Sequence, residues 1–255
     1  MPPVYRLFGV DPVDETVQSA TADRNWAVRA VACTRHVTGQ AARTPKAPGR
    51  CPSDRGFAMP PPFDLAHAAV VAMDCPSGLV RVYAAGEPDA FAQRAAGILR
   101  AARTARKPVV HVQIGFRPGL PEVSARNRLL AAIKTSPKHQ QLFAGAAGAI
   151  HPALGAEPSD IVVLKHRVSA FTGTDLELIV RAQDIDTLVL FGIATSGVVL
   201  STVLDASDRD LQIVVIADCC ADLDAELHRV PITSLFPKRG VVVSAQEFVH
   251  ALETS

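Results

Sequence analysis

Six short, continuously apolar segments that alternate with amphipathic stretches constrain the fold of this chain more than any other feature. Strands that are apolar along their whole length are buried on both faces, as happens when helices cover both sides of a mostly parallel sheet. We therefore predict a three-layer α/β/α domain over residues 63–255, with a six-stranded, mostly parallel sheet. The predicted strands are 68–74 (AAVVAMD), 109–114 (VVHVQI), 161–167 (IVVLKHR), 186–192 (DTLVLFG), 211–218 (LQIVVIAD) and 240–245 (GVVVSA).

Residues 1–62 differ from the rest of the chain. They are rich in Arg, Pro, Ser and Thr, end in three consecutive prolines and have few periodic apolar positions. Such a stretch cannot bury enough apolar surface to offset the entropy that it would lose on ordering. We expect a disordered N-terminal extension. Because Met59 stands directly before the ordered part, an over-extended reading frame is the alternative explanation for residues 1–58.

Composition excludes several classes of function. The 26 Lys and Arg balance 25 Asp and Glu, so no net field is available to hold a polyanion. No apolar run approaches the roughly 20 residues that a membrane helix needs, and the N-terminus lacks the apolar core of a signal peptide. The five cysteines are an odd number, which argues against a disulfide framework. We expect a cytoplasmic protein with no nucleic acid or membrane as partner.

Polar residues stand where the predicted strands end, and ligands of open parallel sheets bind beyond the carboxyl ends of the strands. Asp74 ends the first strand, Lys165 lies near the end of the third, Asp218 ends the fifth, and GIATSG (192–197) follows the fourth. A lysine beside a carboxylate keeps the acid ionised or shuttles its proton. The alternative is structural, because such acids often cap helices and strand-end lysines often extend to solvent. For Asp218 we favour the structural role.

A resemblance to a known family rests on four segments in their order and spacing: AAVVAMD with Asp74, VVLKHRVSAF with Lys165 and Phe171, TDLELIVRAQDIDTLVLFGIAT, and VVLSTVLDASDRDLQIVVIADCCADLDAELH. They resemble the isochorismatase-like hydrolases, also called cysteine hydrolases, from about residue 64 to 250. The resemblance implies a three-layer α/β fold, a small-molecule substrate and a homo-oligomer. In members that cleave amides, it implies that an Asp, a Lys and a Cys act together, the Cys attacking the carbonyl.

The nucleophile position departs from the family pattern. That pattern is Gly, two residues, Thr, two residues, Cys, Val, whereas this chain has GIATSGVV at 192–199, so Val198 replaces the cysteine. A valine cannot attack a carbonyl, so we do not expect cysteine-dependent amidase chemistry. Ser196 and Ser201 flank the position, but on a regular helix they point elsewhere. Cys75 should face the opposite side of the sheet from the preceding acid.

Two hypotheses stay open for the function. The resemblance includes true isochorismatases, which cleave a vinyl ether with the first-strand Asp as proton donor and need no covalent nucleophile. The chain keeps Asp74 and Lys165 as the implied catalytic residues, which favours a hydrolase acting on a vinyl-ether or C–N bond. However, Pro76 replaces a substrate-holding Gln and offers neither an amide side chain nor a backbone donor. The alternative is a catalytically inactive member with a binding, structural or oligomeric role.

The resemblance also implies an anion-binding turn. It places a cis peptide bond at Ile193–Ala194 and makes the backbone amides of Ala194 and Val198 the oxyanion donors. Backbone donors survive a change of side chain, so this binding site is expected to remain. Thr195 offers a hydroxyl to the same place, or caps the following helix.

The remaining candidates are weaker. Arg117, in the loop after the second strand, is positioned to pair with a substrate carboxylate, with a solvated arginine as the alternative. We expect no metal, since His111 stands alone in an apolar strand and is interpreted as a core residue, and His228 as a helix-surface or interface residue. No cofactor is expected, and no GxGxxG motif for a dinucleotide follows any strand.

Overall fold

Six strands form a single sheet in the computed structural model, which describes residues 64–254. The strand order is β3-β2-β1-β4-β5-β6, and each neighbouring pair is parallel. The three-layer α/β prediction is thereby confirmed, whereas the prediction for residues 1–62 lies outside the described residues. The strands are β1 (Ala68–Met73), β2 (Val109–Ile114), β3 (Ile161–Lys165), β4 (Thr187–Ile193), β5 (Gln212–Ala221) and β6 (Val241–Val243).

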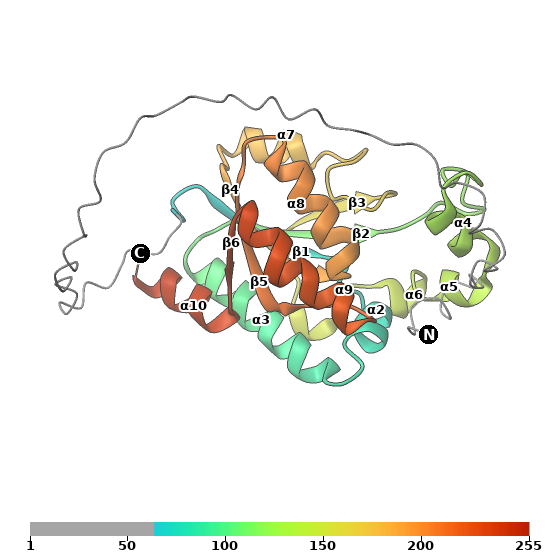
Figure 1. Ribbon diagram of the computed structural model, residues 1–255, viewed down its shortest axis with the longest axis horizontal. Coiled ribbons are helices and arrows are strands. Elements are labelled where there is room, and N and C mark those ends of the chain that lie inside the picture. The colour runs from blue at the N-terminus through green and yellow to red at the C-terminus, as the bar shows by residue number, and fades with distance from the viewer. Residues whose placement is uncertain (1–63, 255) are drawn as a thin grey trace, which may run out of the picture. The chain divides into compact units, whose positions relative to one another are not determined.

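Helices cover both faces of the sheet. In Figure 1, α3 and α10 lie together on one side of the strands, and α7 and α8 lie on the other. The α-helices are α2 (Ser77–Tyr83), α3 (Pro88–Thr104), α4 (Arg128–Thr135), α5 (Pro137–Gln141), α6 (Gly145–Gly148), α7 (Leu176–Ala182), α8 (Leu200–Ser207), α9 (Ala225–Val230) and α10 (Ala245–Thr254). Shorter helical turns are η2 (Pro152–Leu154), η3 (Thr195–Val199), η4 (Pro231–Leu235) and η5 (Phe236–Lys238).

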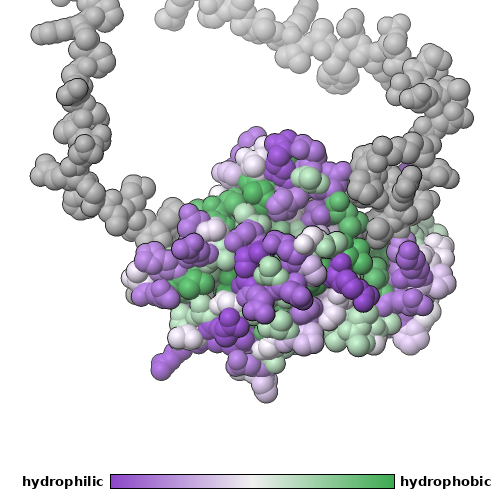
Figure 2. Space-filling model, turned by 90° about the horizontal axis from the view of Figure 1, so that it is seen from below, coloured by the Kyte–Doolittle hydropathy of each residue, from purple (hydrophilic) through white to green (hydrophobic). Residues whose placement is uncertain are grey.

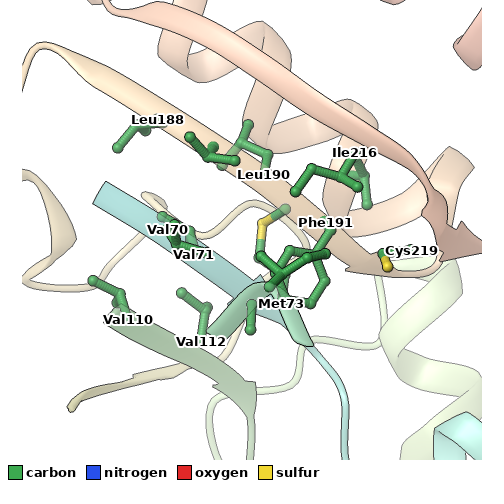
Figure 3. Packing of buried hydrophobic residues seen from close by; sticks show 14 of the residues in the cluster. Val70, Val71, Met73, Val110, Val112, Leu188, Leu190, Phe191, Ile216 and Cys219 are labelled. Carbon is green, nitrogen blue, oxygen red and sulfur yellow. The ribbon is translucent and has the colours of Figure 1, made fainter. Parts of the chain in front are cut away.

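The central strands β1 and β4 are buried along their whole length. Their side chains alternate between the two helical layers, so an unbroken apolar sequence is what both faces require. Figure 3 shows Val70 and Val71 of β1 between the side chains of β2 and β4, with Ile216 of β5 nearby. Each fully buried aliphatic side chain of this kind contributes about 1.5–3 kcal/mol to folding.

The connection between β2 and β3 contains α4, α5, α6 and η2, none of which the sequence pattern predicted. The Asn127 side chain caps α4 by accepting a hydrogen bond from Leu130 N at 3.1 Å. Leu130 and Ile133 pack with Val123 in a small cluster separate from the main core. The helix was missed because it is short and its apolar side packs in this small cluster at the end of β2, so it does not follow the strand-helix alternation of the main core.

The surface seen in Figure 2 is mixed, with hydrophobic residues in small groups between hydrophilic ones. Among residues 64–254, no helix has both the length and the apolar character needed to cross a bilayer.

Gly192 in β4 cannot be replaced without strain. Its φ of 142° is a conformation that only glycine adopts readily, and a Cβ there would stand 1.9 Å from Met73 O of β1. We expect Gly192→Ala to lower the free energy of unfolding by about 3 kcal/mol or more, measured by urea denaturation. The control is Gly97→Ala within α3, where a Cβ meets only Arg100 Nη2 at 3.9 Å. That variant should gain about 0.5–1 kcal/mol. An unchanged midpoint for Gly192→Ala would contradict the prediction.

Candidate active site

Asp74 and Lys165 form a buried ion pair at the carboxyl ends of β1 and β3. Lys165 Nζ lies 2.7 Å from Asp74 Oδ2, and the two side chains are 1% and 7% exposed. Backbone groups hold both partners, since Ile114 N donates to Asp74 Oδ1 at 2.7 Å and Lys165 Nζ donates to Arg167 O at 3.0 Å. The structure thus brings together the acid and the ammonium group that the sequence placed on separate strands.

The environment of Asp74 favours proton exchange. Burial raises the pKa of Asp74 above its ordinary value, while the charge and hydrogen bond of Lys165 and the amide of Ile114 oppose that increase. A carboxyl group with a raised pKa holds its proton closer to neutral pH than an exposed one does. The pair can therefore donate or accept a proton in a site from which bulk water is largely excluded.

The chain leaves β4 through an irregular turn rather than a regular helix. The Ile193–Ala194 peptide is cis, at the position that the family resemblance implied. Ala194 O then accepts hydrogen bonds from Gly197 N at 3.1 Å and Val199 N at 3.3 Å. Gly197 has φ and ψ of −97° and −105°, which interrupts the helical path.

This irregularity corrects the expectation for Ser196. Ser196 and Val198 were expected to point in different directions, as they would on a regular α-helix, but both line the same cavity. The hydroxyl of Ser196 donates to Asp222 Oδ2 at 2.7 Å. No sequence pattern predicts this contact, because the two residues are 26 positions apart and belong to different turns.

A cavity of about 340 Å³ lies where β1, β3, β4 and β5 end. Its polar lining consists of Asp74, Lys165, Tyr83, Ser196 and Asp222, and the rest of the lining is mostly apolar. Part of the apolar wall comes from α4 and the chain after it, including Leu130 and Phe143. Tyr83 and Asp222 are the two polar lining residues that sequence reasoning missed.

Ala194 and Val198 both line this cavity. Val198 is 3% exposed and presents an aliphatic side chain where the resemblance places the nucleophilic cysteine. Thr195 is buried, and its hydroxyl lies 2.9 Å from His228 Nδ1 instead of capping the helix. The turn is thereby tied to α9.

Arg117 lies outside the cavity lining. Its side chain is 64% exposed, and Nη1 lies 3.9 Å from Glu122 Oε1. The structure therefore does not bring Arg117 together with the Asp74–Lys165 pair, because the loop after β2 carries it to the surface.

Three cysteines of the described region, Cys75, Cys219 and Cys220, are buried and absent from the cavity lining. Burial raises the pKa of each thiol, well above its ordinary value for Cys75 and to about 12 for Cys220. The Cys75 thiol donates to Met73 O at 3.4 Å. These thiols are therefore protonated and poorly placed for nucleophilic attack.

Within residues 64–254, no cluster of three or more His, Cys, Asp or Glu side chains could hold a metal ion. His111 is buried, and its Nε2 lies 3.1 Å from Asp160 Oδ2. Asp160 also pairs with Arg103 of α3. Through Asp160, His111 of β2 is thus linked to Arg103 of α3.

Comparisons with known proteins fit this architecture. An isochorismatase domain model matches residues 68–247, more than half of the 255 residues. A solved isochorismatase family protein from Burkholderia thailandensis superposes with a TM-score of 0.64 and 31% identity, over 73% of this chain and 96% of that one.

Two curated relatives match over shorter stretches. The uncharacterized isochorismatase family protein YecD of Escherichia coli O157:H7 is 43% identical over 103 residues, 40% of this chain. The chain spans only 55% of the length of YecD. Maleamate amidohydrolase of Pseudomonas putida is 29% identical over 164 residues, covering 64% of this chain and 75% of the relative.

The buried pair generates a prediction about pH-dependent stability. We expect Lys165→Met to lower the free energy of unfolding at pH 8 by about 3–5 kcal/mol, because it leaves the Asp74 carboxylate buried without its partner. Removing the ammonium raises the pKa of Asp74 further, so the folded variant binds a proton more tightly than the unfolded chain. The deficit should therefore shrink as the pH falls.

Urea denaturation at pH 5 and pH 8 measures this effect. The double variant Asp74→Asn/Lys165→Met, which lacks both charges, is the control and should recover much of the loss with little pH dependence. A deficit of the single variant that is the same at both pH values would show that Asp74 is not the group responsible.

Proposed function

This chain belongs to the isochorismatase family, and we propose that it is a hydrolase that cleaves a small molecule through Asp74 and Lys165 without a covalent intermediate. The bond cleaved is a vinyl ether or a C–N bond. One observation carries the proposal: a buried acid–ammonium pair at 2.7 Å shares its cavity with Val198, which has no nucleophilic atom. The proposed chemistry therefore uses proton transfer and water, and the Ser196 hydroxyl, which donates to Asp222 Oδ2 at 2.7 Å, is assigned a positioning role and not nucleophilic attack.

For a vinyl ether, Asp74 acts as the general acid. Its proton passes to the terminal alkene carbon, and the resulting oxocarbenium ion takes up a water molecule, whose proton returns to Asp74. The hemiketal then collapses with cleavage of the C–O bond. Lys165 stabilises the carboxylate that remains after the proton has left, at the 2.7 Å separation that the structure shows.

For a C–N bond, Asp74 acts as the general base that takes a proton from the attacking water and then passes it to the leaving nitrogen as the C–N bond breaks. The relative named maleamate amidohydrolase gives this branch its support. The tetrahedral oxyanion would be held by the backbone amides of Ala194 and Val198, both of which line the cavity. Backbone groups suit this role because the substitution at position 198 does not remove them.

The second candidate is a catalytically inactive member with a binding or oligomeric role. Val198 favours it, as does Pro76, which directly precedes α2 and forms a β-bridge with Ile150. Pro76 stands where the family pattern has a glutamine, and it is absent from the cavity lining. Its side chain therefore makes no contact in the cavity.

Asp74→Asn tests the hydrolase. We expect kcat to fall by about 10²–10⁴-fold, since the amide cannot transfer the proton. The assay uses the full chain with a panel of small vinyl ethers and primary amides, each with and without a carboxylate. Asp218→Asn is the matched control, because Asp218 lies within β5 but outside this cavity. Its Oδ1 accepts a hydrogen bond from Ala245 N at 2.8 Å, which an asparagine can also accept.

Activity that persists in Asp74→Asn would exclude the proposed mechanism. A wild-type protein that turns over no member of the panel would favour the inactive alternative.

Thiol alkylation gives an independent test. Iodoacetamide is expected to leave wild-type activity unchanged, because Cys75, Cys219 and Cys220 are buried and have raised pKa values. Val198→Cys is the control, since it puts a thiol into the cavity beside Asp74 and should be alkylated. Inactivation of the wild type with an adduct on Cys75 would refute the proposed site. Amide hydrolysis that appears only in Val198→Cys would identify a cysteine-hydrolase site that has lost its nucleophile.

A further inference from the structure

Asp222 is a second carboxylate in the cavity, directly after β5, and its orientation is fixed. Ser196 donates to Oδ2 from both its backbone N, at 2.8 Å, and its Oγ, at 2.7 Å. Leu223 N donates to Oδ1 at 2.8 Å. These contacts use three of the roughly four acceptor positions of a carboxylate, which leaves room on Oδ1 for one more donor. The side chain is therefore a preorganised acceptor that faces the cavity.

The described lining of the cavity offers no unpaired cation to an anionic ligand. Among the described lining residues, the charged side chains are Asp74, Lys165 and Asp222. Lys165 is already committed to Asp74 at 2.7 Å and to the Arg167 carbonyl at 3.0 Å. A substrate carboxylate would thus lose its water next to Asp222 without finding a new counter-charge, which is costly.

Tyr83 supplies a neutral donor to the cavity that it lines together with the two acids. Burial and the charges of Asp222 and Asp74 raise the pKa of Tyr83 to about 12, so its hydroxyl stays protonated. Around these groups the wall is apolar, with Leu79, Phe143 and Leu223 as examples. The cavity therefore fits a small apolar body with a hydrogen-bond donor at one end.

We propose that Asp222 is the specificity-determining residue of this cavity and that the substrate is a neutral or cationic small molecule whose N–H or O–H group donates to it, not a carboxylate. Ser196 is a positioning residue, because it acts by holding Asp222. This inference rests on the proposed hydrolase function, since it assigns a substrate class to the same cavity.

Three probes of one shape test the inference: isovaleramide, which is neutral; isopentylamine, which is cationic; and isovalerate, which is anionic. Their dissociation constants for the full chain are measured by saturation-transfer NMR titration at pH 7.5. We expect the wild type to bind the amide and the amine at least about tenfold more tightly than the acid. This comparison needs no variant, so it stands even where a substitution impairs folding.

The variant Asp222→Asn tests whether Asp222 causes the preference for the neutral and cationic probes over the anionic one. The amide side chain keeps an acceptor for Ser196 but loses the charge, so binding of isopentylamine should weaken about tenfold and the rejection of isovalerate should disappear. Asp89→Asn is the control, because it removes one negative charge from an exposed position in α3 and should leave all three constants unchanged.

Tighter binding of isovalerate than of isovaleramide by the wild type would overturn the inference, as would an unchanged order of the three probes in Asp222→Asn or no binding of any probe. The outcome is separable from that of the hydrolase proposal, because binding requires no turnover. Activity that survives Asp74→Asn would overturn the mechanism and leave the charge preference standing.

Discussion

The buried contact between Asp74 and Lys165 is the interaction on which the rest of the site depends. Neither charge would be stable in this environment alone, because the free energy needed to remove either ion from water exceeds the interaction energy that neutral neighbours supply. The two residues come from strands on opposite sides of β2, and Asp74 reaches across because it leaves β1 with a φ of 48°. Ile114 at the end of β2 then holds the acid through its backbone amide.

A close approach of β1 and β4 positions the part of the site that comes from the turn after β4. Gly192 lets the two backbones come together, and the irregular turn that follows passes over the cavity. Thr195 ties this turn to α9, and Ser196 ties it to the end of β5. The turn with Val198 and the fixed carboxylate of Asp222 therefore line the same cavity as the Asp74–Lys165 pair.

The proposed function relies on this combination, because Val198 offers no nucleophilic atom at the position where the family pattern has cysteine. A thiol would supply attack by the protein itself, whereas an acid–ammonium pair supplies only protons and electrostatic stabilisation. The apolar wall, part of which comes from α4, limits the water that enters, and low local polarity strengthens each charge–dipole contact inside. A second carboxylate in such a cavity acts mainly on substrate selectivity, because it lowers the affinity for anions more than it raises the affinity for neutral donors.

The sequence by itself determined the sheet, since an unbroken apolar strand is stable only when both faces are covered. It also located Asp74 and Lys165, because parallel strands bring their carboxyl ends to one edge. Only the tertiary structure decided that Ser196 and Asp222 join the cavity, that α4 helps to close it, and that Arg117 stays at the surface. Those outcomes depend on turns without periodicity and on contacts between residues far apart in the chain, which local residue patterns do not encode.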